Sequence, residues 1–404
     1  MAETKSSLVE ERRVVKAAPE VVFTVLTSPA DMVGWLCDEA RCETRPGASY
    51  ELGWNTGYTV HGKVMAVERS KLFTVAWHGS GEPGETTVSF ALTPKDNGTE
   101  ATIRHSGFGR GAKWAAAIAE SRKGWVRGLE CLAYLVETGV DLRDARRPMM
   151  GVSLGEQVDA DRLAKEGVDA TTGVYLAGVS EGMSAQAAGL RAHDVVTTID
   201  GKPIPDFPAL VSLLRGHVAG DLIEVAYVRG KEHKTCTLEL KPKPMPDIPF
   251  DSTALLAALL ERYEKARSGL VKVMAGVSEE KAGWAPAEGE WSAKEAIAHL
   301  CVTERDLHYL LGDLLLGNET HTPGNPSVLP EKLAAVLSAA PTVAGLLNRL
   351  AQDQADTLAI VAALRPEIIV NKARYHRIGQ TVYDFADHVD EHIGQIRAAL
   401  AAVK

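Results

Sequence analysis

Two histidines near the C-terminus, His388 and His392, are four positions apart in a segment with helical periodicity. Residues at i and i+4 share a helix face, so both imidazoles can point at one metal ion. A catalytic zinc-type site takes three protein ligands and keeps one position open. A third ligand must therefore come from another segment, and the candidate is His299. The pattern indicates a metal site, although a histidine pair beside an apolar face is also compatible with ordinary packing.

The segment that carries this pair is expected to be a helix over Val382–Val403, because apolar residues recur there every three or four positions. Three more amphipathic helices are expected over about 252–277, 292–317 and 342–364. Four long helices predict a bundle, and bundles build metal sites from side chains on facing helices. Three other histidines fall off these patterns and are expected at the surface or in loops: His308, His321 and His376.

Composition limits the classes of function. With 404 residues, the chain is expected to form two or three domains. A net charge of −9 argues against general nucleic-acid binding, which requires clustered basic residues. No apolar run reaches the roughly 20 residues of a membrane span, and the polar start does not resemble a signal peptide. Five scattered cysteines suit a reducing compartment. We therefore expect a cytoplasmic protein without a membrane span.

The N-terminal part alternates strand and turn signals and ends in a long amphipathic helix over about 112–137. One antiparallel sheet with one long helix is an α+β arrangement. Strands are expected at Leu8–Ala17, Ser49–Trp54, Tyr58–Glu68, Leu72–His78, Thr86–Thr93 and Thr99–His105, with a first helix at Pro19–Leu26. No pair of residues here indicates catalysis, and His105 is expected to be a hydrogen-bonded structural histidine.

This part resembles the START-like (SRPBCC) helix-grip fold, in its branch of homologues of the heat-shock-protein ATPase activator. The resemblance is carried by Ala18-Pro-Glu-Val-Val-Phe23, Trp35, Arg45-Pro-Gly47, Trp77, His105-Ser-Gly-Phe108 and Trp125. It implies a curved sheet around the long helix, with room between them for a small apolar ligand. The alternative is that the tryptophans simply fill the core.

The middle part contains short strands and a distinctive segment, Gly178–Ile204, in which Asp200-Gly201 predicts a hairpin turn. This segment resembles a PDZ domain of the bacterial HtrA-associated type. The resemblance implies capture of a C-terminal or extended peptide of a partner protein by strand addition. No serine-nucleophile motif of the Gly-Asn-Ser-Gly-Gly kind precedes it, so a protease is not indicated. By the resemblance, the peptide-binding residues would be Met150, Gly151, Val152, Leu210 and Leu214.

Two features of this middle part depart from the PDZ pattern. His193 stands where these domains usually have glycine before aspartate, and the binding loop lacks the usual aromatic residue or leucine before its glycine. The second departure leaves the peptide preference open. A PDZ fold that serves only as a spacer is the alternative.

The C-terminal part resembles the DinB-like family. Trp291-Ser292-x-x-Glu295-x-x-x-His299-Leu300 matches its second-helix motif, and His388-x-x-x-His392-Ile393-x-Gln395-Ile396 matches its last helix. The resemblance implies that His299, His388 and His392 are the metal ligands. Periodicity alone does not bring His299 to the other two. Imidazoles suit a divalent transition metal, zinc or nickel first and iron or copper as alternatives.

Together these features predict three domains: a helix-grip domain over 1–145, a PDZ domain, β-barrel-like, over 146–243, and a four-helix bundle over 250–404. The expected fold class is multidomain, α+β followed by all-α. The favoured hypothesis is a binding or adaptor protein without assigned catalytic residues. The alternative is a metal-dependent enzyme, a thiol transferase or hydrolase, whose PDZ domain recruits substrate or partner.

Overall fold

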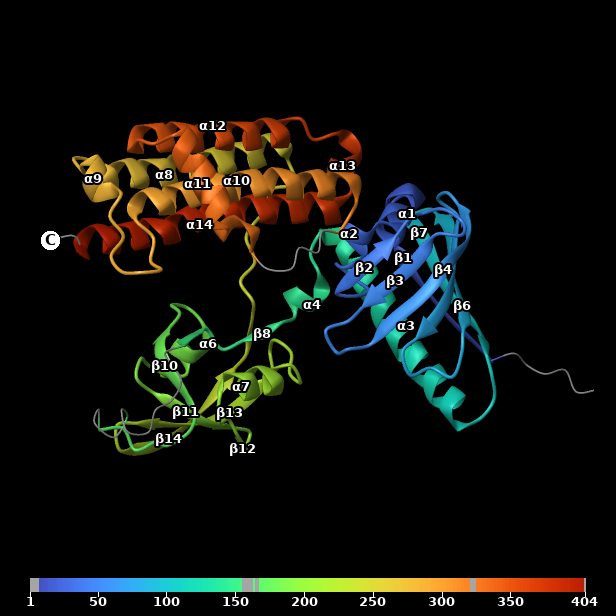
Figure 1. Cartoon of the computed structure of the whole chain (residues 1–404). Coiled ribbons are helices and arrows are strands. Elements are labelled where there is room, and N and C mark those ends of the chain that lie inside the picture. The colour runs from blue at the N-terminus through green and yellow to red at the C-terminus, as the bar shows by residue number, and fades with distance from the viewer. Residues whose placement is uncertain (1–6, 155–162, 164–166, 320–324, 403–404) are drawn as a thin grey trace, which may run out of the picture. The chain divides into compact units, whose positions relative to one another are not determined.

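The computed structural model describes residues 7–154, 163, 167–319 and 325–402 (Figure 1). They fall into two compact units, one formed by the chain up to Asp141 together with the chain from Asp247 onward, the other by Leu142–Pro246. The first unit contains an α+β domain and a helical bundle, and the second is a small β-rich domain. The predicted fold class is confirmed.

Seven antiparallel strands build the N-terminal sheet, in the order β1-β7-β6-β5-β4-β3-β2. The long helix α3 (Ala112–Thr138) crosses one face of this sheet (Figure 1). It ends at Gly139, whose φ of 79° suits glycine at a helix C-terminus. The other elements are β1 (Ser7–Val15), α1 (Pro19–Thr27), α2 (Pro29–Met32), β2 (Glu39–Cys42), β3 (Ser49–Gly53), β4 (Thr59–Glu68), β5 (Leu72–Gly79), β6 (Thr86–Lys95) and β7 (Gly98–Phe108). The sequence did not predict β2, which is short and lies at the edge of the sheet.

The middle domain has the sheet order β14-β13-β11-β10-β9, with β12 beside β11. Its hairpin turn is as predicted, because Asp200 and Gly201 both have positive φ, 49° and 70°. His193 also has a positive φ of 71°, which explains why glycine is usual at that position. The elements are α4 (Leu142–Ala145), β8 (Pro148–Met149), β9 (Val152–Leu154), β10 (Val174–Val179), α6 (Ser184–Ala187), β11 (Val195–Ile199), β12 (Lys202–Pro203), α7 (Phe207–Leu214), β13 (Leu222–Arg229), β14 (Glu232–Glu239) and β15 (Lys241–Pro242).

The C-terminal bundle is built from four long helices that lie side by side (Figure 1). Ser292 and Glu295 form the predicted capping box at the start of the second. The helices are α8 (Ser252–Met274), α10 (Ala293–Leu316), α12 (Val343–Ala362) and α14 (Lys372–Ala402), with the shorter α9 (Glu279–Ala282), η1 (Pro326–Val328), α11 (Pro330–Ala339) and α13 (Pro366–Val370). No single described helix is long and apolar enough to cross a membrane. Only α11 and α12 together reach that length and apolarity, and they are bent by 108°.

The last helix begins ten residues earlier than predicted, at Lys372 rather than Val382. Gly379 hides the true start, because glycine inside a periodic segment suggests a break. Here it serves packing, since a Cβ at this position would lie 2.4 Å from Cγ2 of Ile248. His376 is consequently a buried helical residue, so its predicted surface position was wrong. His308 is also helical, half-buried and bonded to Thr357, while His321 lies outside the described residues.

A buried polar network separates the bundle core into two apolar clusters. Glu304 is buried, and its Oε1 accepts hydrogen bonds from the Tyr263 hydroxyl, 2.5 Å away, and from Thr357 Oγ1, also 2.5 Å away. Nε2 of His308 lies 2.8 Å from that threonine oxygen. Because the threonine proton is directed to the carboxylate, the imidazole nitrogen must donate to the threonine. Buried polar groups that are satisfied in this way favour one register of the helices over others.

Within the first unit, α2 and α14 are joined by a buried ion pair. Arg374 NH2 lies 2.5 Å from Oδ2 of Asp31, and the two side chains are only 6% and 1% exposed. Asn371 Nδ2 donates to the same carboxylate at 3.0 Å. Burial raises the pKa of Asp31, opposed by the charge of Arg374. Such a pair stabilises the fold only while both partners are present.

Arg374→Met should destabilise the first unit by roughly 3–5 kcal/mol, because it leaves the Asp31 carboxylate buried without its cation. The matched control is Arg262→Met, which breaks an exposed ion pair with Asp387 and should change stability by about 1 kcal/mol or less. Thermal unfolding of the full-length variants measures both. Equal shifts for the two would contradict this interpretation.

Candidate metal centre

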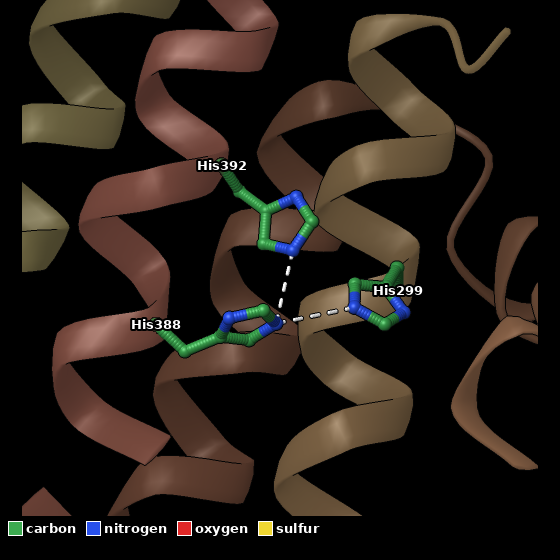
Figure 2. A group of neighbouring side chains, drawn as sticks. All are labelled: His299, His388 and His392. Atoms are coloured by element: carbon green, nitrogen blue, oxygen red, sulfur yellow. Dashed lines mark hydrogen bonds between the residues drawn. The ribbon is translucent and has the colours of Figure 1, made fainter. Parts of the chain in front are cut away.

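Three histidine side chains from two helices of the bundle converge on one point. His299 comes from α10, and His388 and His392 come from consecutive turns of α14. Figure 2 shows the rings directed toward one another. Nε2 of His388 lies 3.0 Å from Nε2 of His392 and 3.4 Å from Nε2 of His299. The three ligand atoms all lie within 4.8 Å of one another. Two nitrogens held about 2.0–2.1 Å from one tetrahedral ion would be roughly 3.3 Å apart.

The opposite nitrogen of each ring faces an oxygen acceptor. Nδ1 of His299 lies 3.1 Å from the carbonyl oxygen of Ser327. Nδ1 of His388 lies 3.1 Å from Oε2 of Glu391, and Nδ1 of His392 lies 2.8 Å from Oε1 of Gln395. A carbonyl and a carboxylate only accept hydrogen bonds, so Nδ1 must carry the proton. Partners of this kind fix the tautomer and ring orientation of metal-ligating histidines.

This tautomer has an electrostatic consequence at the centre of the cluster. A neutral imidazole carries one N–H, so a protonated Nδ1 leaves a lone pair on Nε2. In three neutral rings of this tautomer, the lone pairs point at one another across 3.0 and 3.4 Å, and the contacts dashed in Figure 2 become hydrogen bonds only with an added proton. They repel unless a cation lies among them. A metal ion or a shared proton would meet this requirement.

Burial disfavours an added proton on His299 and His392. Desolvation, with the neighbouring histidines adding to it, lowers the pKa of His392 to about 4. Desolvation is also the main cause that lowers the pKa of His299. Trp291 excludes water on one side, with its ring centroid 4.7 Å from that of His299 and 6.1 Å from that of His392. His299 and His392 are therefore neutral at pH 7, which is the form that binds metals. The donor set fits a divalent transition-metal ion with room for a further ligand.

Comparison with known families agrees with the three folds. The family described as Activator of Hsp90 ATPase homolog 1-like protein (AHSA1) matches residues 16–137, the PDZ domain family matches residues 141–240, and the DinB superfamily matches residues 262–396. The chain therefore joins an AHSA1-like domain, a PDZ domain and a DinB bundle. All three predicted resemblances are confirmed.

Curated relatives match through the PDZ region. The periplasmic serine endoprotease DegP of Salmonella typhimurium is 28% identical over 130 residues, which are 32% of this chain and 26% of DegP. The human serine protease HTRA4 is 40% identical over 70 residues, 17% of this chain and 14% of that protein. The chain thus covers about a quarter or less of the length of these two relatives.

Among solved structures, protein MLL2253 of Mesorhizobium loti is 26% identical, with 32% of this chain and 96% of that chain covered and a TM-score of 0.30. The Aha1 dimer of Colwellia psychrerythraea is 23% identical over 32% of this chain and 96% of that one, with a TM-score of 0.28. DynU16, from a dynemicin biosynthetic locus, is 18% identical, with 60% of this chain and 90% of that chain covered and a TM-score of 0.32. Similarity at this level does not bear on function.

The residues around the DinB cluster were only partly foreseen. The pair on α14 follows from its spacing, and His299 entered through the DinB motif alone. The Nδ1 partners Glu391 and Ser327 were missed, and Gln395 was given no role. The signal for two of them was present, because each lies three positions after its histidine on one helix face. Ser327 could not be found in this way, because it lies beyond the C-terminal end of α10, outside its helical periodicity.

The PDZ residues predicted to bind peptide occupy different layers. Met150 and Leu210 are core residues, 2% and 3% exposed. Val152 belongs to β9 and Leu214 to α7, and both are half-buried. Gly151 has a φ of 73°, and a Cβ there would lie 2.2 Å from Met183. Within the described strands, β9 pairs with β10 alone, which places it at the edge of the sheet.

Both ring nitrogens of His105, in the AHSA1-like domain, are engaged in hydrogen bonds. Its Nδ1 accepts from Nε1 of Trp125 at 3.1 Å, so Nε2 carries the proton and donates to Oγ1 of Thr86 at 2.7 Å. That hydroxyl donates in turn to the carbonyl of Trp77 at 3.0 Å. Burial lowers the pKa of His105 to about 4. These contacts fit the predicted structural role.

The lowered pKa values make the metal-free bundle sensitive to acid. An unfolded imidazole has a pKa near 6.5, so the unfolded state binds more protons than the folded state between about pH 6.5 and 4. The contribution of a neutral His392 to stability is therefore complete above pH 6.5 and is lost as the pH falls toward 4. Replacement by glutamine, which does not titrate, should remove roughly 2–3 kcal/mol of this pH dependence.

The measurement is thermal unfolding of EDTA-treated full-length protein and its His392→Gln variant between pH 7.5 and 4. The wild type should lose more stability over this interval. Parallel pH profiles would show that the imidazole is not held neutral by burial.

Proposed function

We propose that this protein is a binding and adaptor protein whose DinB bundle holds one divalent transition-metal ion through His299, His388 and His392. The supporting observation is the direction of the three Nδ1 atoms, each toward an oxygen, which leaves three Nε2 lone pairs together. A metal ion would accept the three lone pairs in coordinate bonds and so remove this repulsion. Zinc and nickel suit three neutral imidazoles, as do iron and copper.

The first test is metal content. Full-length protein purified without a metal-affinity tag should carry about one equivalent of transition metal, and His388→Ala should lose most of it, because one of three ligands is gone. The matched control is His233→Ala, which removes an imidazole that is 70% exposed in the PDZ domain. Elemental analysis by mass spectrometry reads both. Equal metal content in the two variants would refute the site.

The adaptor role belongs to the PDZ domain. We propose that β9 receives an extended C-terminal segment of a partner protein as an added strand, with backbone hydrogen bonds supplying affinity. Half-buried apolar residues on β9 and α7, among them Val152 and Leu214, would contact the side chains of that peptide. Peptide preference would depend on these positions.

Leu214→Asp should weaken peptide binding at least tenfold, because it places a charge where an apolar side chain would dock. The control is Leu222→Asp on β13, where leucine is already 69% exposed. The probe is a set of fluorescent heptapeptides ending in valine, leucine or phenylalanine, each with a free or an amidated C-terminus, titrated into full-length protein. Equal affinity for the two variants would exclude the proposed surface.

In the AHSA1-like domain, a small apolar ligand is our proposal for the interior between sheet and α3. Tyr50 is fully buried, and its hydroxyl has no hydrogen-bond partner among the described residues. Its ring lies 6.1 Å from that of Phe73 and 6.3 Å from that of Trp77. An apolar molecule with one acceptor atom would satisfy this hydroxyl, which otherwise costs about 1–3 kcal/mol.

A second candidate function is metal-dependent catalysis, favoured by the number of protein donors. Three histidines leave a tetrahedral ion one open position. An ion bound there could hold a thiol for transfer or activate water for hydrolysis. The residues around the open position decide between these alternatives, and the Thr303 hydroxyl is a polar group that borders the cluster, with Oγ1 3.3 Å from Nε2 of His299.

A further inference from the structure

Thr303 lies one helical turn after His299 on α10 and borders the histidine cluster. Its Oγ1 is 3.3 Å from Nε2 of His299, the nitrogen that faces the other two imidazoles. The same oxygen is 2.9 Å from the carbonyl oxygen of His299. A hydroxyl has one proton to donate and two lone pairs that accept. Which of the two neighbours receives the proton depends on whether the site is loaded.

With an ion bound, the direction of the Thr303 hydroxyl is fixed. Nε2 of His299 would then use its lone pair for the ion and could not accept a hydrogen bond. The hydroxyl proton must go to the His299 carbonyl, the closer of the two acceptors. The lone pairs of Oγ1 are then left beside the cluster, where they can only accept.

We propose that Thr303 is a specificity-determining residue that selects ligands carrying a proton for the open position of the metal site, and so favours water as the reactant. This inference rests on the metal binding proposed above. A water molecule can donate a hydrogen bond to Oγ1. Azide, or a thiol that has lost its proton, has nothing to donate and meets a lone pair instead. Thr303 thereby favours hydrolysis over thiol transfer as the chemistry of this bundle.

A charge that acts on His299 is paired and does not oppose this selection. Asp306 follows on the same helix, and its negative charge acts on His299. Nζ of Lys332, on α11, lies 2.7 and 3.0 Å from the two carboxylate oxygens of Asp306 and neutralises it. The neutral hydroxyl is therefore the group that discriminates between ligands of equal size.

The experiment loads full-length protein with cobalt(II) and titrates it with azide at fixed pH, following the visible absorption of the ion. Azide must displace water in the wild type. Thr303→Val keeps the side-chain shape but removes the acceptor, so azide should bind about fivefold more tightly, the equivalent of one hydrogen bond. Thr303→Ser keeps the hydroxyl and should restore the wild-type azide affinity.

Thr381→Val is the matched control. Its hydroxyl donates to the carbonyl of Arg377, four residues earlier, at 2.8 Å, just as Thr303 donates to the carbonyl of His299, but Thr381 lies on α14 seven residues before His388. It should leave azide binding unchanged. If all variants bind one cobalt and the same azide affinity persists in Thr303→Val, this inference is overturned and the metal site stands. If the wild type itself binds no cobalt, both proposals are overturned.

Discussion

Repulsion between three imidazole lone pairs is the constraint around which the DinB bundle is arranged. Every Nδ1 proton is directed outward to an oxygen, so three neutral rings have no proton left for hydrogen bonds among their Nε2 atoms. The bundle tolerates this because its helices are held by other contacts. The network around Glu304 fixes α8, α10 and α12 against one another, and the two apolar clusters pack on either side of it. The cost of assembling the three histidines is offset by the packing of the remaining core.

The positions of the three histidines depend on the helices that carry them. The capping box at Ser292 sets where α10 starts, and the packing of α10 against α14 then directs His299 toward the other two histidines. On α14, helical spacing alone places His388 and His392 on one face. Each ring then acquires its partner from a nearby position, two on the same helix and one from the 3₁₀ turn at Ser327. Spacing along one helix therefore determines two of the three ligand positions, and helix packing determines the third.

The limits of prediction follow from the same physics. Periodicity predicted the pair on α14 and the strands of the N-terminal sheet, because both depend on residues near in sequence. It did not place His299, whose position depends on how two helices pack. It also placed the start of α14 too late, because Gly379 looks like a helix break until Ile248 is seen against it. The short strand β2 was missed, since four residues at a sheet edge carry little alternation. Resemblance to known families supplied what periodicity could not.

The PDZ domain is connected to the rest of the chain by two segments that pair with each other. Met149 of β8 lies opposite Lys241 of β15, Pro148 lies opposite Pro242, and the Lys243 amide donates to the carbonyl of Arg147 at 3.0 Å. The chain thus enters and leaves this domain at neighbouring points. Adjacent ends are what allow a domain to be inserted into a host protein without disturbing it. The PDZ domain is therefore connected in the way of an inserted domain. Replacing residues 142–246 with a short linker would give an AHSA1–DinB protein whose two remaining folds keep all of their own strands and helices.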